Sequence, residues 1–218
     1  MIRNLKGSRC LMTLCRFAFL LVIALISTVS LIMRVFPTQA ASPSATTPAV
    51  GMARTSNNAG YWIVTQDGAV YSFGNAIYHG GANQFNHRGT IVGLTATSTD
   101  GGYWEIGTDG GVYAFGDAPF FGSMGGKYLN APIVGIARTR TNGGYWLAGA
   151  DGGIFAFGDA GFYGSMGGQH LNTPIVGIAR TSTNGGYWLV GADGGIFSFG
   201  DANFHGSMGG GTAIGRSG

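Results

Sequence analysis

One unit of 42 residues occurs four times in this chain, and that repetition limits the possible fold more than any other feature of the sequence. Asp-Gly and Phe-Gly recur at this spacing together with the dipeptide Tyr-Trp, which lies at 61–62, 103–104, 145–146 and 187–188. Counted from Pro48, the units are 48–89, 90–131, 132–173 and 174–215. Such a chain folds as copies of one supersecondary structure that bury their faces against one another.

Each unit has the pattern of four short strands separated by tight turns. Asp-Gly between two apolar runs is typical of a hairpin, because the glycine takes the positive φ angle that such a turn needs. No run has helical periodicity, and strands of 4–6 residues at this spacing indicate an all-β fold. In the third unit the expected strands are Ile133–Ala137, Tyr145–Gly149, Ile154–Phe157 and Phe162–Met166.

The apolar runs are nearly continuous, which predicts sheets that are buried on both faces. Radial packing of the copies achieves this, and 42 residues is a typical length for one propeller blade. We therefore predict a β-propeller of four four-stranded blades over residues 48–215. Four is at the low end of the known range. The blades could close alone, pair with a second copy as a homodimer, or form part of a larger propeller.

The units resemble the GYW…DGG(I/V)F(A/S)FGDA repeats of exported bacterial proteins, which often stand beside cell-wall hydrolase or other envelope domains. The resemblance covers about residues 48–210 and implies a propeller-like module at the cell surface, without implying a reaction. The first unit departs from the pattern, with Asn75 in place of the repeated aspartate and residues 79–83 in place of GSMGG. The pattern also ends after Gly210.

The first 40 residues have the features of an export signal, which we expect to be helical. Residues 1–16 are polar and basic, Phe17–Met33 is apolar, and small residues surround Ala40, after which we expect cleavage. An uncleaved membrane anchor is the alternative, although 17 residues fall short of the roughly 20 that a spanning helix needs. Residues 41–47 are a polar linker. The repeats would in either case lie outside the cytoplasm, at the cell surface or beyond.

Charge and residue usage exclude several classes of function. From residue 41 onward seven Lys and Arg stand against nine Asp and Glu, so the excess of positive charge expected of a nucleic-acid-binding protein is absent. Both cysteines, Cys10 and Cys15, lie in the leader. The histidines share no metal-ligand spacing, and the serines recur as repeat positions. We therefore predict no metal, no cofactor and no catalytic set, and we consider an enzyme the less favoured reading.

The repeated motifs themselves have structural explanations. The Tyr-Trp pairs could stack on sugars, but they lie in the middle of apolar strands, so we expect them to be core residues. The aspartates of Asp-Gly are expected to form turns, and Asp117, Asp159 and Asp201 are expected to cap the turn that follows the third strand.

A functional site should break the repeat, and two features do. Glu105 occupies a slot held by Ile63, Leu147 and Leu189, and a carboxylate there needs a partner. The connections between units also vary, and variable loops on a rigid scaffold commonly bind ligands. In a propeller they surround the channel mouth together with the turns between second and third strands. The candidate ligand-binding residues are Glu105, Asn83, Gln84, Asn86, His87, Arg88, Lys127, Tyr128, Asn130, Gln169, His170 and Asn172.

These observations leave three hypotheses. The first is a non-catalytic binding or scaffolding module of the cell envelope, with a glycan, peptidoglycan or an envelope protein as its ligand. The second is a propeller-type hydrolase in which Glu105 and residues of the channel mouth hold a water or a metal. The third is a structural spacer without a ligand. Under each hypothesis, contact with a membrane would be limited to the N-terminal segment, if it is not cleaved.

Overall fold

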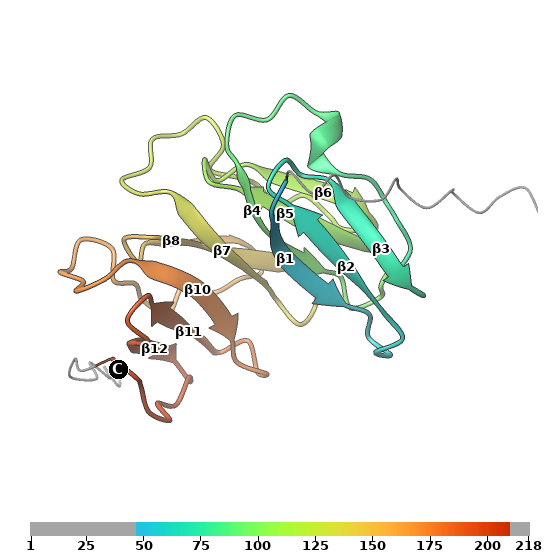
Figure 1. Ribbon diagram of the computed structural model, residues 1–218. Helices are drawn as coiled ribbons and strands as arrows, with labels where there is room; N and C mark the ends of the chain where they lie inside the picture. The colour runs from blue at the N-terminus through green and yellow to red at the C-terminus, as the bar shows by residue number, and fades with distance from the viewer. Residues whose placement is uncertain (1–46, 210–218) are drawn as a thin grey trace, which may run out of the picture. The chain divides into compact units, whose positions relative to one another are not determined.

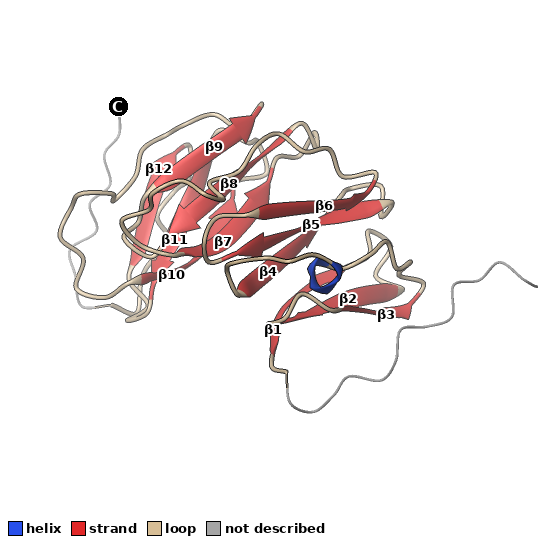
Figure 2. Cartoon of the chain, turned by 90° about the horizontal axis from the view of Figure 1, so that it is seen from above, coloured by secondary structure: helices blue, strands red, loops and turns tan. Residues whose placement is uncertain are grey.

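The computed structural model describes residues 47–209, and it is built from β-strands (Figure 1). Twelve strands form four antiparallel three-stranded sheets, one for each repeat. The short 3-10 helix η1 (Ala82–Gln84), blue in Figure 2, follows the first sheet. The strands are β1 (Ala49–Arg54), β2 (Gly60–Thr65), β3 (Val70–Gly74), β4 (Ile91–Ala96), β5 (Gly102–Gly107), β6 (Val112–Gly116), β7 (Ile133–Arg138), β8 (Gly144–Gly149), β9 (Ile154–Gly158), β10 (Ile175–Arg180), β11 (Gly186–Gly191) and β12 (Ile196–Gly200).

Each sheet is a simple meander with the middle strand paired on both sides. The Asp-Gly turn predicted from the sequence closes the second hairpin. In the second unit Gly110 has a φ of 75°, and the Asp109 Oδ1 atom accepts the Gly111 N–H at 3.0 Å. Asp67, Asp151 and Asp193 accept the equivalent N–H. The first strand of every sheet has a register irregularity beside its glycine.

The fourth strand predicted for each unit does not form. In the third unit Phe162–Met166 has no strand structure, and Gly164 has a φ of 128°, which a regular strand does not accommodate. Side chains instead hold this segment. The Trp146 Nε1–H donates to the Gly161 carbonyl at 2.6 Å, and the Tyr187 hydroxyl of the next unit accepts the Tyr163 N–H at 3.1 Å. The sheets are therefore three-stranded, with a long loop between one sheet and the next.

The aspartate after the third strand caps a different turn from the one expected. The Asp117 carboxylate accepts hydrogen bonds from the hydroxyls of Thr97 (2.9 Å) and Thr99, which belong to the turn between the first and second strands. Asp159 and Asp201 accept the hydroxyls of Thr141 and Thr183. The prediction of a capping role was correct, but the turn between β4 and β5 is the one stabilised in the second unit.

Successive sheets pack against each other, and the Tyr-Trp pairs lie in the core as predicted, except that Tyr61 of the first sheet is 40% exposed and Trp188 of the fourth sheet is only partly buried. Trp and Tyr point to opposite faces of the middle strand, so the Trp of one sheet meets the Tyr of the next. The ring centroids of Trp62 and Tyr103 are 5.8 Å apart, and both side chains are fully buried. The strands β1, β4, β7 and β10 are neighbours in that order, and the four sheets do not close into a ring.

The N-terminal predictions, the signal segment of residues 1–40 and most of the linker 41–47, fall outside the described residues, as does the end of the last unit. Within residues 47–209 no helix has the length and apolar character needed to cross a membrane. The same part of the chain contains no group of three or more His, Cys, Asp or Glu side chains that could hold a metal ion.

Candidate functional site

The variable connections lie at the edge of the sheets that also carries the turns between second and third strands. In the first unit the Asn83 N–H donates to the Gly68 carbonyl at 3.2 Å, and His87 Nε2 lies 3.1 Å from the Asp67 carbonyl oxygen. In the second unit the Met124 N–H donates to the Gly110 carbonyl at 2.9 Å. Each connection is thus attached to the turn of its own sheet.

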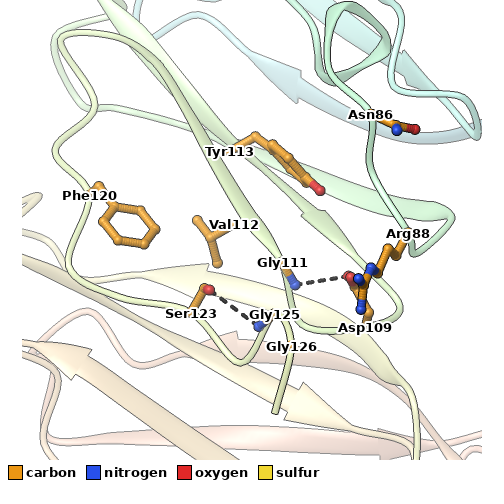
Figure 3. Close-up of a pocket in the computed structure, with 10 residues that line it drawn as sticks. All are labelled: Asn86, Arg88, Asp109, Gly111, Val112, Tyr113, Phe120, Ser123, Gly125 and Gly126. Atoms are coloured by element: carbon orange, nitrogen blue, oxygen red, sulfur yellow. Dashed lines mark hydrogen bonds between the residues drawn. The ribbon is translucent and has the colours of Figure 1, made fainter.

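One hollow at this edge brings together residues from three segments (Figure 3). It has a volume of about 450 Å³, and we call it the Tyr113 hollow. Its walls come from the first connection, from the β5–β6 hairpin and from the loop that follows β6. The lining residues are Asn86, Arg88, Asp109, Gly111, Val112, Tyr113, Phe120, Ser123, Gly125 and Gly126.

Two aromatic side chains give the Tyr113 hollow its apolar surface. Tyr113 is held by Phe85, whose ring is stacked at 6.4 Å, and by the edge of the His87 ring at 6.1 Å. Burial raises the pKa of the Tyr113 hydroxyl, and the nearby Asp109 and Glu105 add to this, so the phenol stays protonated and can donate a hydrogen bond. Phe120 is 60% exposed, so most of its ring is free to contact a ligand.

Two of the polar side chains in the Tyr113 hollow are held by hydrogen bonds, and two others are exposed. Asp109 is fixed by its bond to the Gly111 N–H, and Ser123 Oγ accepts the Gly125 N–H at 3.2 Å (Figure 3). Asn86 and Arg88 are exposed on the connection. Gly111 leaves space in the hollow beside Tyr113, because a Cβ on Gly111 would lie 3.2 Å from the Tyr113 hydroxyl oxygen.

The predicted connection residues do not form one site. Asn86 and Arg88 line the Tyr113 hollow, and the His87 ring packs against the Tyr113 ring. Asn83 and Gln84 belong to η1, where the Gln84 Nε2–H donates to the Tyr78 hydroxyl at 2.7 Å. The remaining candidates are on the second and third connections, outside this hollow; they are Lys127, Tyr128, Asn130, Gln169, His170 and Asn172.

Glu105 is enclosed between the first and second sheets and does not line the Tyr113 hollow. Its side chain is fully buried on β5, and its two carboxyl oxygens lie 3.3 and 3.4 Å from the Ala82 nitrogen. Burial raises the pKa of the Glu105 carboxyl to about 8, the Ala82 N–H partly opposes this, and Asp67 raises it further. At neutral pH the group is therefore mostly a neutral acid.

A second hollow, of about 310 Å³, lies where the turns between first and second strands meet. Arg54 and Arg138 line it, and burial lowers the pKa of Arg138. Asp100 is already engaged, because it accepts the Ser56 N–H at 2.9 Å and the Ser56 hydroxyl at 2.6 Å. This carboxylate joins two sheets, so we assign the second hollow to the packing between sheets.

Sequence reasoning missed the aromatic half of the Tyr113 hollow. Tyr113 and Phe120 correspond to Phe155 and Phe162, which lie in two strands expected for the third unit, and neither is among the candidate ligand-binding residues. One signal was present, because the slot of Tyr113 holds Phe155 and Phe197 in the last two units. The first unit has Tyr71 in this slot, so the hydroxyl distinguishes the first two units from the last two, whereas Glu105 occurs in the second unit alone.

No family model matches the chain, and no curated protein matches it either. Among solved structures it is similar to the β-propeller domain of Cps50 (Swd1) from Myceliophteria thermophila, with a TM-score of 0.51 and 10% sequence identity. The similarity covers 70% of this chain and 53% of that one, so the chain matches about half of that protein's length. The likeness supports a propeller-like arrangement of sheets and says nothing of an activity.

Proposed function

We propose that this chain is an exported, non-catalytic binding module of the cell envelope, and that the Tyr113 hollow binds a cell-wall glycan. The observation that carries the proposal is the combination of Tyr113 and Phe120 with Asn86, Arg88 and Asp109 in one hollow. Aromatic side chains offer apolar faces to the C–H groups of a sugar ring, while amide, guanidinium and carboxylate groups bond its hydroxyls. The volume is within the range of small-ligand sites.

The departure of this hollow from the repeat supports the same proposal. The second unit has Tyr128 and Asn130 at the positions of Asn86 and Arg88, and the third unit has Phe155 at that of Tyr113. The scaffold is thus kept while polar groups change at its edge, as expected where loops carry recognition. The proposal of export depends on residues 1–40, and the resemblance to envelope-associated repeats supports it.

Co-sedimentation with purified cell walls tests the proposal. We expect the full chain to bind, and Phe120→Ala to weaken binding about tenfold, which corresponds to about 1.4 kcal/mol. The matched control is Phe162→Ala, which removes the equivalent ring of the third unit, 62% exposed, and should bind as the unchanged protein does.

Two results would contradict this function. Equal losses for Phe120→Ala and Phe162→Ala would move the ligand away from the Tyr113 hollow. Release of soluble wall fragments by the unchanged chain, and not by Glu105→Gln, would favour the hydrolase instead.

A conservative second variant, Tyr113→Phe, removes only the hydroxyl and should weaken binding less than Phe120→Ala does.

A further inference from the structure

Three internal joints between successive sheets repeat one set of contacts. In each joint the Trp of one sheet packs on the Tyr of the next, with ring centroids 5.7–5.8 Å apart. The same Tyr hydroxyl donates to a glycine carbonyl of the preceding unit at 2.5–2.6 Å. The joints are Trp62–Tyr103–Gly80, Trp104–Tyr145–Gly122 and Trp146–Tyr187–Gly164.

The glycine of each joint also leaves space for a phenylalanine ring of the next sheet, and we call this space the glycine seat. A Cβ on Gly80 would lie 2.6 Å from the ring of Phe115, and Gly122 and Gly164 face Phe157 and Phe199 in the same way. The fourth unit keeps the equivalent Gly206 with a φ of 116°, but a Cβ there would meet nothing within 4 Å. The fourth sheet therefore has a seat that no described residue fills.

The outer face of the fourth sheet is apolar and open. Met208 is 91% exposed, whereas its equivalent in the third unit, Met166, is 7% exposed. Trp188 is only partly buried, whereas the other three tryptophans are fully buried. Val176 on β10 is 53% exposed. We call Val176, Trp188, Gly206 and Met208 the tail face.

The outer face of the first sheet has the complementary half of the joint. Tyr61 is 40% exposed and Met52 is 64% exposed, whereas the equivalent Tyr103 and Leu94 of the second sheet are 0% and 8% exposed. Phe73 stacks on Tyr61 at 5.1 Å and occupies the slot of the phenylalanines that fill the glycine seats. We call Met52, Tyr61, Ile63 and Phe73 the head face.

We propose that the head face of one copy of this chain packs on the tail face of a second copy, and that two copies close head to tail into one dimeric propeller. The residues on the two faces match the pairs of the internal joints. Trp188 would meet Tyr61, Gly206 would seat Phe73, and Met208 would meet Ile63, as Met124 lies against the cluster that contains Leu147.

We infer the number of copies from the four sheets that the structure describes. A head-to-tail contact between unlike faces closes into a ring only when the rotation at each joint adds up to a full turn. This chain matches 53% of the length of the propeller domain to which it is similar, so two copies supply about the length of one such domain. Eight sheets are also within the known range for propellers.

Analytical ultracentrifugation of the full chain, exported and purified as the host leaves it, tests the dimer. We expect a dimer whose dissociation constant rises roughly a hundredfold in Met52→Glu and in Met208→Glu, because each buries a charge in an apolar joint. Both side chains are exposed in the single copy, so folding should not change. The matched control is Ile77→Glu, which alters a side chain that is 59% exposed on neither face.

A double variant sharpens the test. Met52→Lys with Met208→Glu places opposite charges in the same joint, because the equivalent residues Ile136 and Met124 contact one apolar cluster. We expect this chain to dimerise more strongly than either single variant, and most strongly at low salt. The proposal would be overturned by a monomer at every concentration, by chains longer than two copies, or by equal behaviour of Met52→Glu and Ile77→Glu.

Discussion

The first and second joints differ at one side chain, Glu105 against Leu147, and in the backbone of the connection that faces it. In the second joint Leu147 faces Met124, whose N–H donates to the Gly110 carbonyl at 2.9 Å. In the first joint the corresponding carbonyl, that of Gly68, accepts the N–H of Asn83 instead of that of Ala82. The connection has thus shifted by one residue, and the Ala82 N–H has lost its backbone acceptor.

Glu105 compensates for this shift. Its carboxyl group accepts the Ala82 N–H, and the small Ala82 side chain leaves room for it where Met124 fills the second joint. A buried N–H without an acceptor would cost about 1–3 kcal/mol. The comparison shows that the glutamate, which breaks the repeat in sequence, has a structural partner only because the loop facing it also changed.

The largest expected effect comes from moving the glutamate to the joint that lacks the shift. Leu147→Glu should lower the free energy of unfolding by about 3–5 kcal/mol, because no free N–H faces it there and the carboxylate would be buried unpaired. Urea denaturation followed by Trp fluorescence measures the loss.

Met124→Ala in the same chain should recover part of the loss caused by Leu147→Glu, since it recreates the space found beside Ala82. Ile77→Glu is the matched control, because it introduces the same charge at the surface. A cost below about 1 kcal/mol for Leu147→Glu would show that the two joints do not differ as described.

The next effect is a pH dependence that belongs to the first joint alone. The pKa of Glu105 is about 8 in the folded protein and close to 4.5 when unfolded, so between these values the folded state holds the extra proton. Stability should therefore fall as pH rises from about 4.5 to about 8, by a few kcal/mol in all, and level off above that.

Glu105→Gln keeps an acceptor for the Ala82 N–H and cannot ionise. It should remove this part of the pH dependence and make the protein more stable than the unchanged chain at pH 9, with little difference at pH 5. Denaturation curves at several pH values measure the effect. Parallel pH profiles for the two proteins would mean that Glu105 does not titrate in the joint.

The sequence was sufficient to predict three of the four strands in each unit, the Asp-Gly turns and the burial of six of the eight Tyr and Trp side chains in the pairs, because all of these follow from local periodicity and turn chemistry. Phe162–Met166 was predicted wrongly as a strand. The backbone groups of Tyr163 and Gly164 bond to the side chain of Tyr187 in the next unit, and no local pattern contains that information.

The candidate site was predictable in part for a similar reason. Asn86, Arg88 and Glu105 stand out because they break the repeat, but the partner of Glu105 is a backbone N–H, which has no signature in the sequence. Phe120 has the appearance of a strand residue, and only the three-dimensional structure shows that its ring is exposed beside Tyr113.

The smallest expected effect concerns the feature that the joints share. Tyr103→Phe, Tyr145→Phe and Tyr187→Phe each remove a hydroxyl that accepts one backbone N–H at 3.1–3.2 Å and donates to a glycine carbonyl. Each should lower the free energy of unfolding by about 1–2 kcal/mol, by nearly the same amount in all three joints. Tyr61→Phe is the matched control within one copy, because no described unit precedes it, and it should leave the unfolding of the monomer unchanged. A markedly larger loss of unfolding free energy for Tyr103→Phe than for the other two variants would contradict this. It would mean that the first joint depends more on its tyrosine hydroxyl than the other joints do, despite the contact between Glu105 and the Ala82 N–H.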